Sequence, residues 1–307
     1  MTISSRPYES ENDLRVIQQA TAEWINTAGF LGRVNPSDIA LRLFNGMRIY
    51  DPHEIVRLWQ DSDGRLVGWA MVYPAWNSFE VQLAPEHRQD ALANEVLDWA
   101  EGALINWMQN VGRSDSPIEL DVFEGDSVRI TLLEHRGYAC GELRGIISVR
   151  SLDGVTPPYL PDGFTIRSLT GEQDADKLVA LVNTAFGWNW TVEAYQEVLR
   201  SPGYRAENEM VVIAPDGRFA ASCILLPDEH NGTVMFENVC TSPDFRRLGL
   251  AASLLTAGMH RMKEQGFTLA VVPHGAHLDG AGALYASVGF QSTYMIYRYT
   301  KRVRASG

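Results

Sequence analysis

The chain has 307 residues, of which 45% are hydrophobic, and a formal net charge of −12. Its length favours two domains. Its negative charge argues against non-specific binding of nucleic acid. No apolar run approaches the roughly 20 residues of a membrane span, and the first residues lack the apolar centre of a targeting segment. Three widely spaced cysteines, Cys140, Cys223 and Cys240, indicate neither a disulfide framework nor a metal cluster, so we expect a cytoplasmic protein that binds no membrane.

The negative charge is concentrated in the first half of the chain. Residues 1–160 hold 13 basic and 23 acidic residues, a net charge of −10. Residues 161–307 hold 13 basic and 15 acidic residues, a net charge of −2. This asymmetry has two interpretations: it keeps the protein soluble, or it attracts a cationic amine substrate.

The first half of the chain alternates between helical and strand-like patterns. Apolar residues at helical spacing predict a helix over residues 10–27, and a shorter one follows from Pro36 to Leu43. The turn residues 61–64 predict a hairpin between strands 55–59 and 66–73. The patterns that follow predict a strand over 79–83, a helix over 91–108, a strand over 117–123, a helix over 127–135 and a strand over 138–149.

A connecting segment divides the chain. Residues 153–163 contain three prolines and two glycines, a composition typical of a connection between domains. We therefore predict an N-terminal domain over residues 1–152 and a C-terminal domain over residues 164–307.

The second half repeats the order of elements found in the first. The patterns predict a strand from Phe164, helices over 174–186 and 192–199, strands over 210–214, 218–226 and 234–241, a long helix, a strand over 269–272, a helix over 280–287 and closing strands over 290–299. This repetition indicates an internal duplication. Residues of the same type occupy matching places in the two halves: Gly64 and Gly217, Pro85 and Pro243, Arg88 and Arg246, Gly137 and Gly289.

The stretch from Glu237 to Leu255 joins a strand, a basic loop and a helix. Strand-forming residues end at Thr241, and Arg246 and Arg247 precede Gly249 at the start of an amphipathic helix. The first backbone N–H groups of a helix are unpaired and lie at the positive end of its dipole, so they bind anions well. The stretch therefore predicts a phosphate or pyrophosphate site. The alternative is a loop that serves tight packing only.

Two motifs in the second half resemble those of the GCN5-related N-acetyltransferases, the GNAT superfamily. Arg246-x-x-Gly249-x-Ala251, preceded by Pro243, is similar to the family's motif between its fourth strand and third helix. Leu284-Tyr285-x-x-x-Gly289-Phe290 is similar to its later Leu-Tyr-x-x-x-Gly-Phe motif. The resemblance extends faintly into the first half, as in tandem-GNAT proteins such as the mycothiol-synthase-like enzymes. It implies an α/β (α+β) fold of two units, each a mixed twisted sheet flanked by helices.

The resemblance also implies acetyl-coenzyme A as the donor of an acetyl group and direct attack by an amine. The pyrophosphate is expected on the loop and helix start, and the pantetheine arm along the strand edge. The cofactor-binding residues so implied are Val239, Cys240, Thr241, Arg246, Arg247, Leu248, Gly249, Leu250 and Ala251.

The same resemblance assigns chemical roles to two residues of this half. Tyr285 matches the family's tyrosine that protonates the leaving thiolate; the alternative is a tyrosine that only packs. Glu237 is the candidate base, directly or through water; the alternative is a structural acid in an ion pair. Cys240 is not expected to carry the acyl group, because no histidine lies beside it in the sequence and the family transfers directly.

Several positions depart from the family's pattern. Leu278 stands where family members often carry an asparagine that contacts the cofactor. In the first half, Ala91 and Leu133 replace the matching Gly249 and Tyr285, and Asp90 puts an acid at the expected phosphate site. We therefore predict that the first half is a scaffold without cofactor. His274 and His277 lack accompanying ligands, so no metal is expected.

The acceptor is the least determined partner. Trp188 and Trp190 join two helices where the family often binds its acceptor, and they form either a cation-holding wall or part of the core. A small metabolite amine, an antibiotic, a peptide N-terminus and a lysine side chain all remain open as substrates, as does oligomerisation. The alternative function is a coenzyme A-binding sensor or scaffold without turnover, which the departure at Leu278 favours.

Overall fold

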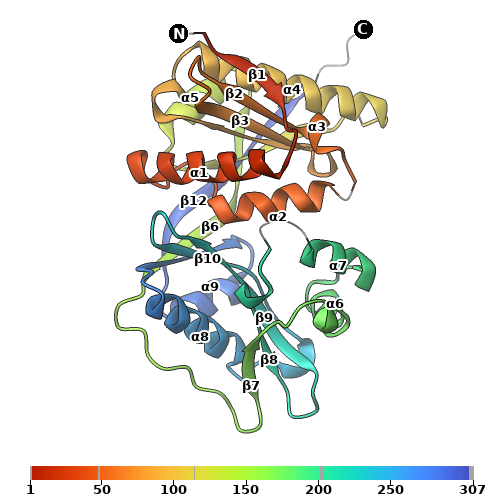
Figure 1. Cartoon of the computed structure of the whole chain (residues 1–307), viewed down its shortest axis with the longest axis vertical. Helices are drawn as coiled ribbons and strands as arrows, with labels where there is room; N and C mark the ends of the chain where they lie inside the picture. Colours follow the sequence, from red (N-terminus) through yellow and green to blue (C-terminus); the bar gives the residue numbers. More distant parts are fainter. Residues whose placement is uncertain (1, 48, 114, 201–203, 304–307) are drawn as a thin grey trace. The chain divides into compact units, whose positions relative to one another are not determined.

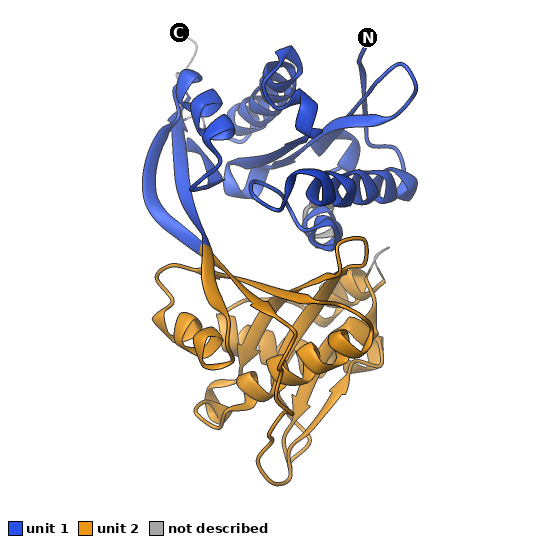
Figure 2. Ribbon diagram, turned by 90° about the vertical axis from the view of Figure 1, so that its left-hand side faces the viewer, with its two compact units in different colours: residues 1–145, 294–307 blue, residues 146–293 orange. Residues whose placement is uncertain are grey.

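The computed structural model describes residues 2–47, 49–113, 115–200 and 204–303, and it has a mixed α/β fold (Figure 1). The chain forms two compact units, drawn in different colours in Figure 2. Unit 1 comprises Met1–Gly145 and Tyr294–Gly307, and unit 2 comprises Ile146–Thr293. In the part of the chain that is described, no helix is both long and apolar enough to cross a membrane.

Unit 1 is built on an antiparallel sheet of four strands in the order β1-β2-β3-β4. Its strands are β1 (Ser4–Pro7), β2 (Val56–Gln60), β3 (Leu66–Tyr73) and β4 (Ser78–Leu83). All residues of β3 are buried, which requires cover on both faces of the sheet. Figure 1 shows α1 and α2 on one side of this sheet and α4 on the other.

The remaining elements of unit 1 complete this cover. They are α1 (Glu11–Ala28), α2 (Pro36–Met47), α3 (Pro52–Ile55), α4 (Ala91–Asn110), β5 (Pro117–Phe123) and α5 (Ser127–His135). Helix α1 buries Leu14, Ile17 and Trp24, which share one face at helical spacing. Strand β5 pairs antiparallel with β12 (Gln291–Arg302), through the residues of β12 that follow Met295.

Unit 2 contains the repeated order of elements. They are β7 (Thr165–Ser168), α6 (Ala175–Phe186), α7 (Val192–Leu199), β8 (Glu209–Ile213), β9 (Phe219–Asp228), β10 (Thr233–Thr241), α8 (Leu250–Glu264), β11 (Leu269–Gly275) and α9 (Asp279–Ser287). Its sheet order is β6-β11-β10-β9-β8-β7, where β6 spans Ala139–Ser151. The pair β10–β11 is parallel, whereas β7 to β10 pair antiparallel.

Two hydrophobic cores flank the sheet of unit 2. One includes Leu254 and Met259 of α8 with Tyr285 of α9 and Phe236 of β10. The other includes residues of α6 and α7 and Cys240 of β10. Figure 1 places α8 and α9 on one side of the strands and α6 and α7 on the other.

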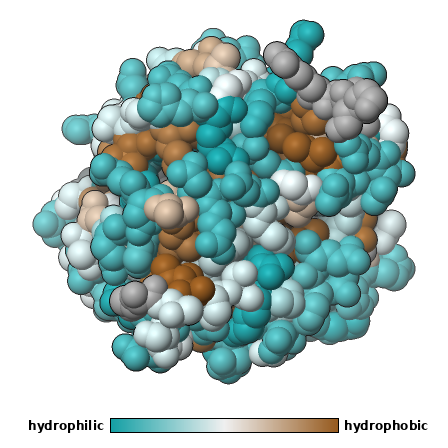
Figure 3. All heavy atoms as spheres, turned by 90° about the horizontal axis from the view of Figure 1, so that it is seen from above, coloured by the Kyte–Doolittle hydropathy of each residue, from teal (hydrophilic) through white to brown (hydrophobic). Residues whose placement is uncertain are grey.

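On the face drawn in Figure 3, hydrophilic residues predominate and hydrophobic ones gather in separate patches.

An ion pair occupies the same place in both units and supports the predicted duplication. Arg6 Nη2 lies 2.6 Å from Asp13 Oδ1, and Arg167 Nη2 lies 2.7 Å from Asp174 Oδ1. Each carboxylate also accepts a 2.8 Å bond from the backbone N–H four residues before it. The arginine in each pair lowers the pKa of its aspartate, to about 2 for Asp174. The pair fixes the first strand of each unit to its first helix.

The predicted helices and strands are present with ends that differ by up to four residues, and the predicted closing strands form one strand, β12. Strand β1, helix α3 and several short 3-10 helices were not predicted. β1 was not predicted, because its four residues show no alternation and it forms only as an edge beside β2. The strand predicted from Ile55 begins at Val56, since Ile55 ends α3. That short helix forms because the Asp51 side chain accepts a 2.9 Å bond from the His53 N–H.

The compact units divide the chain differently from the two predicted repeats. Strands β6 and β12 each contain a unit boundary, after Gly145 and after Thr293. The C-terminal strand counts with unit 1 because β12 pairs with β5 along residues 296–302. The domain limits at residues 152 and 164 describe sequence repeats and stay a prediction.

Candidate active site

Strand β10 loses its neighbour on one side halfway along its length. Its parallel pairing with β11 extends only from Thr233 to Met235. Its antiparallel pairing with β9 continues, but the register shifts between Glu237 and Cys240. Asn238 lies inside this bulge with a φ of 51°, a left-handed conformation that asparagine tolerates better than most residues. Bulges re-aim side chains and often lie next to active sites.

The loop after β10 leads into a helix whose first amides are available. Gly249 is the N-cap of α8 with a φ of 76°, and no side chain in the described ranges caps that helix. A Cβ at this position would meet no atom within 4 Å, so the left-handed backbone, rather than space, requires glycine. Arg247 has a φ of 67°, which turns the loop a second time. The N-terminus of α8 thus offers unpaired N–H groups.

A cavity of about 830 Å³ connects these two features in unit 2. Its wall includes most of the residues predicted to bind the cofactor, together with the predicted proton donor: Val239, Cys240, Thr241, Arg246, Arg247, Gly249, Leu250, Ala251 and Tyr285. Leu248 and Glu237, the other two predicted site residues, do not line it. Leu248 lies in the loop with its side chain 45% exposed.

The charge of the cavity wall favours an anionic ligand. Arg246 and Arg247 line the wall and are exposed, and neither takes part in an ion pair with the residues that the structure describes. No described aspartate or glutamate lines the wall. The two guanidinium groups and the start of α8 therefore present positive charge on one side of the cavity.

Tyr285 extends from α9 into the other end of the cavity and is only 6% exposed. Its ring centroid lies 5.4 Å from that of His274 and 6.1 Å from that of Phe290. Burial raises the pKa of its hydroxyl well above the usual value, and the charge of Glu237 raises it further. The phenol therefore stays protonated at neutral pH and can only donate a proton there.

Glu237 and Cys240 flank the bulge of β10. Glu237 is half-buried, and its charge raises the pKa of the Tyr285 hydroxyl. The Cys240 thiol is buried, which raises its pKa to about 11, and it lies 3.2 Å from the Ser222 hydroxyl. A thiol with this pKa is almost entirely protonated at neutral pH and is a poor nucleophile.

His274 is a part of the site that sequence reasoning did not assign. Its Nε2 atom is buried and has no hydrogen-bond partner in the described part of the chain, while Nδ1 lies 3.2 Å from the Gly275 carbonyl oxygen. Its contact with the Tyr285 ring follows from the fold and has no signal in the sequence. Together with His277 it belongs to no group of three candidate metal ligands among the described residues.

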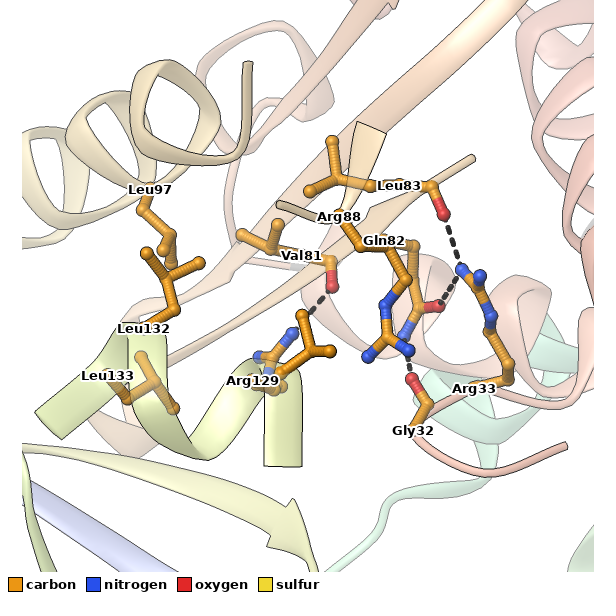
Figure 4. Close-up of a pocket in the computed structure, with 11 residues that line it drawn as sticks. Gly32, Arg33, Val81, Gln82, Leu83, Arg88, Leu97, Arg129, Leu132 and Leu133 are labelled. Carbon is orange, nitrogen blue, oxygen red and sulfur yellow. Dashed lines mark hydrogen bonds between the residues drawn. The ribbon is translucent and has the colours of Figure 1, made fainter. Parts of the chain in front are cut away.

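The matching cleft of unit 1 is filled by the chain's own polar groups. The Asp90 carboxylate caps α4, accepting a 2.8 Å bond from the Leu92 N–H, and also lies 2.6 Å from His87 Nδ1. Figure 4 shows two arginine side chains bonded to carbonyl groups of β4. Arg129 donates to the Val81 carbonyl oxygen at 2.8 Å, and Arg33 donates to that of Leu83 at 2.5 Å.

These bonds fall at the positions that correspond to the strand edge predicted to bind the cofactor in unit 2. When the two halves are aligned on Pro85 and Pro243, Val81 matches Val239 and Leu83 matches Thr241. Side chains of unit 1 therefore occupy both the helix start and the strand edge that a cofactor would need. This arrangement supports the prediction that unit 1 is a scaffold.

The segment from Phe186 to Trp190 combines the two interpretations that the sequence left open. The rings of Phe186 and Trp188 stack with centroids 4.3 Å apart, and the residues are 39% and 41% exposed. Trp190 instead packs at 5.5 Å against buried Tyr195 and belongs to the core beside α6 and α7. The stacked pair is thus partly exposed, whereas Trp190 packs against the core.

Comparison with known proteins shows which family the second half of the chain is similar to. Residues 175–290 match the model of the acetyltransferase (GNAT) family. Two relatives are named mycothiol acetyltransferase. The one from Segniliparus rotundus is 23% identical over 75% of this chain and 89% of that protein. The one from Saccharomonospora viridis is 24% identical over 77% of this chain and 79% of that protein.

Solved structures show the same fold along the whole chain. A GCN5-related N-acetyltransferase from Sphaerobacter thermophilus is 20% identical, with a TM-score of 0.65 over 98% of this chain and 96% of that one. A tandem GNAT protein from the clavulanic acid biosynthesis pathway is 13% identical, with a TM-score of 0.67 over 100% of both chains. The fold is thus that of a tandem GNAT protein.

Proposed function

Because residues 175–290 form an acetyltransferase domain of the GNAT family within a tandem GNAT fold, we propose that the protein transfers an acetyl group from acetyl-coenzyme A to an amine. The proposed active site lies in unit 2. One observation carries the proposal: a single cavity extends from the uncapped start of α8, along the edge of β10, to the Tyr285 ring. The name of the two relatives, mycothiol acetyltransferase, supports acetyl transfer.

The residues around the cavity fit the parts of coenzyme A. The backbone N–H groups of residues 247–251 would hold the pyrophosphate, next to Arg246 and Arg247. The backbone of Val239 and Thr241 would pair with the amides of the pantetheine arm, since this edge of β10 extends past its ladder with β11. When bound, acetyl-coenzyme A supplies an activated acyl group on a thiol leaving group.

Tyr285 and Glu237 divide the proton transfers of the reaction. The amine forms a C–N bond as the C–S bond breaks, so the nitrogen must lose a proton and the sulfur must gain one. Glu237 accepts the first proton, directly or through one water. Tyr285 donates the second, a role that suits a phenol whose burial keeps it protonated.

A second candidate function is binding of coenzyme A without turnover, as a sensor or scaffold. Leu278 favours it, because this residue lines the cavity, 48% exposed, where family members often carry an asparagine that contacts the cofactor. Release of free thiol from acetyl-coenzyme A, measured against a panel of amines, separates the two functions. Amine-dependent release supports the transferase. Tight binding of the cofactor without release for any amine supports the sensor.

A further inference from the structure

A second, smaller cavity of about 30 Å³ lies inside unit 1, in the cleft that corresponds to the cofactor cleft of unit 2. Three arginines form its polar side: Arg33 before α2, Arg88 before α4 and Arg129 in α5. Leucine side chains, among them Leu97 and Leu133, form its other side. Figure 4 shows the three guanidinium groups directed toward the same region beside β4.

Two of these arginines keep buried donors without acceptors. Arg33 is only 3% exposed; its Nη1 bonds the Leu83 carbonyl oxygen, but its Nη2 has no partner among the described residues. Arg129 bonds the Val81 carbonyl oxygen through Nη1, while its Nε is equally buried and without a partner there. A buried donor left unsatisfied costs about 1–3 kcal/mol, and more when it is charged. A hydrogen-bond acceptor in the cavity would therefore be stabilising.

The charges around the cavity do not balance. The acids that face the three guanidinium groups are Asp126 and Glu80. Asp126 Oδ2 lies 2.5 Å from Arg88 Nη2, and Glu80 Oε1 lies 4.0 Å from Arg129 Nη2. The three arginines and the two acids therefore have a net charge of +1. Burial, with repulsion from Arg88 and Arg129, lowers the pKa of Arg33 to about 10, so its guanidinium stays charged at neutral pH.

We propose that this cavity binds one small monovalent anion, of the size of chloride, between Arg33 and Arg129. One such ion supplies the missing acceptor for both buried donors and cancels the surplus charge. A cavity of about 30 Å³ has room for a monatomic ion. One negative charge matches the surplus, whereas the double charge of sulfate or phosphate would exceed it. The ion links the segment before α2 to α5 across the end of β4, and so keeps this cleft closed.

Bromide locates the ion directly. Crystals of the full chain soaked in sodium bromide should show an anomalous peak within hydrogen-bond distance of Arg33 Nη2 and Arg129 Nε. Thermal unfolding at constant ionic strength gives the second measurement, with gluconate replaced stepwise by chloride, bromide, acetate or sulfate. At a concentration of about 100 times the dissociation constant, the halides should raise the melting temperature by roughly 5–10 °C.

Variants test whether the halide-dependent shift in melting temperature comes from this cavity. Arg33→Met should abolish both the bromide peak and the halide-dependent shift, whereas Arg15→Met, which removes an exposed arginine of α1, should keep them. If Arg33→Met does not fold, Arg129→Lys keeps the charge but removes the Nε donor, and should weaken halide binding several-fold. Acetate, which is larger than either halide, should act less strongly than both.

Three results would overturn the proposal. One is the absence of a bromide peak in the cavity, with density for water alone. Another is a halide-dependent shift of equal size in wild type and Arg33→Met, which would show a general salt effect. The third is stronger stabilisation by sulfate than by chloride, which would contradict the monovalent charge and the small volume.

Discussion

Replacing Tyr285 with phenylalanine removes only the hydroxyl that we assign to protonation of the leaving sulfur. The ring keeps its contacts with His274 and Phe290, whose centroids lie 5.4 and 6.1 Å away. Any loss of rate therefore reports on chemistry rather than on packing.

The expected loss is large. A positioned proton donor contributes roughly 10²–10⁴-fold to a rate, which corresponds to about 3–5 kcal/mol of activation free energy. The affinity for coenzyme A should change little, because the proposed contacts come from the start of α8 and the edge of β10. The effect should shrink for an acyl donor with a more acidic thiol, since a better leaving group needs the proton less.

Steady-state kinetics with free-thiol detection, together with the melting temperature, test this expectation. Tyr8→Phe is the matched control, because Tyr8 is a tyrosine of the unit 1 core that is 4% exposed. It should keep a normal kcat, whatever it does to stability. A kcat of Tyr285→Phe within about threefold of the parent would remove Tyr285 from the mechanism and leave solvent as the proton source.

Three further predictions follow from the structure. Calorimetric titration with coenzyme A should saturate near one equivalent per chain, since Asp90, Arg33 and Arg129 fill the matching cleft of unit 1; two equivalents would contradict that assignment. Gly249→Glu should abolish cofactor binding. Gly249→Ala has the same backbone strain at a φ of 76° but no added charge, so it should retain more of that binding. Equal affinities of the two variants for coenzyme A would refute a pyrophosphate at this position. Burial raises the pKa of Glu209 to about 7, so its contribution to stability is present below about pH 4.5 and lost as pH rises through 7. Glu209→Gln should therefore be more stable than wild type at pH 8, by at most about 3 kcal/mol, and equal to it near pH 4, as urea unfolding at both pH values will show. A difference independent of pH would refute this assignment.

Much of the fold and of the cofactor cleft could be predicted because local chemistry determines them. The amphipathic pattern of residues 250–264 and the glycine at its start are visible in the sequence, and the structure places both as expected. The turn at residues 61–64 joins β2 and β3 for the same reason: its residue types suit a tight connection whatever surrounds it.

Features that depend on distant parts of the chain could not be predicted. The bulge at Asn238 arises from the register between β9 and β10, and the approach of His274 to Tyr285 depends on where α9 packs. The ion pair of Arg6 and Asp13 looks like ordinary surface charge in the sequence, although Asp13 is buried. Sequence spacing alone carries no information on these contacts, because they are made across elements.

Unit 1 shows how the chain's own side chains can fill the cleft that corresponds to the one proposed for the cofactor in unit 2. The carbonyl groups at the end of β4 lie in a cleft and need donors, just as those of β10 do when the cleft is open. Arginine suits this task, because its long side chain reaches across the cleft and offers several N–H groups in one plane. Arg33 and Arg129 each bond one carbonyl group in this way. Their charges, however, exceed those of Asp126 and Glu80, and the anion that we propose would balance this surplus.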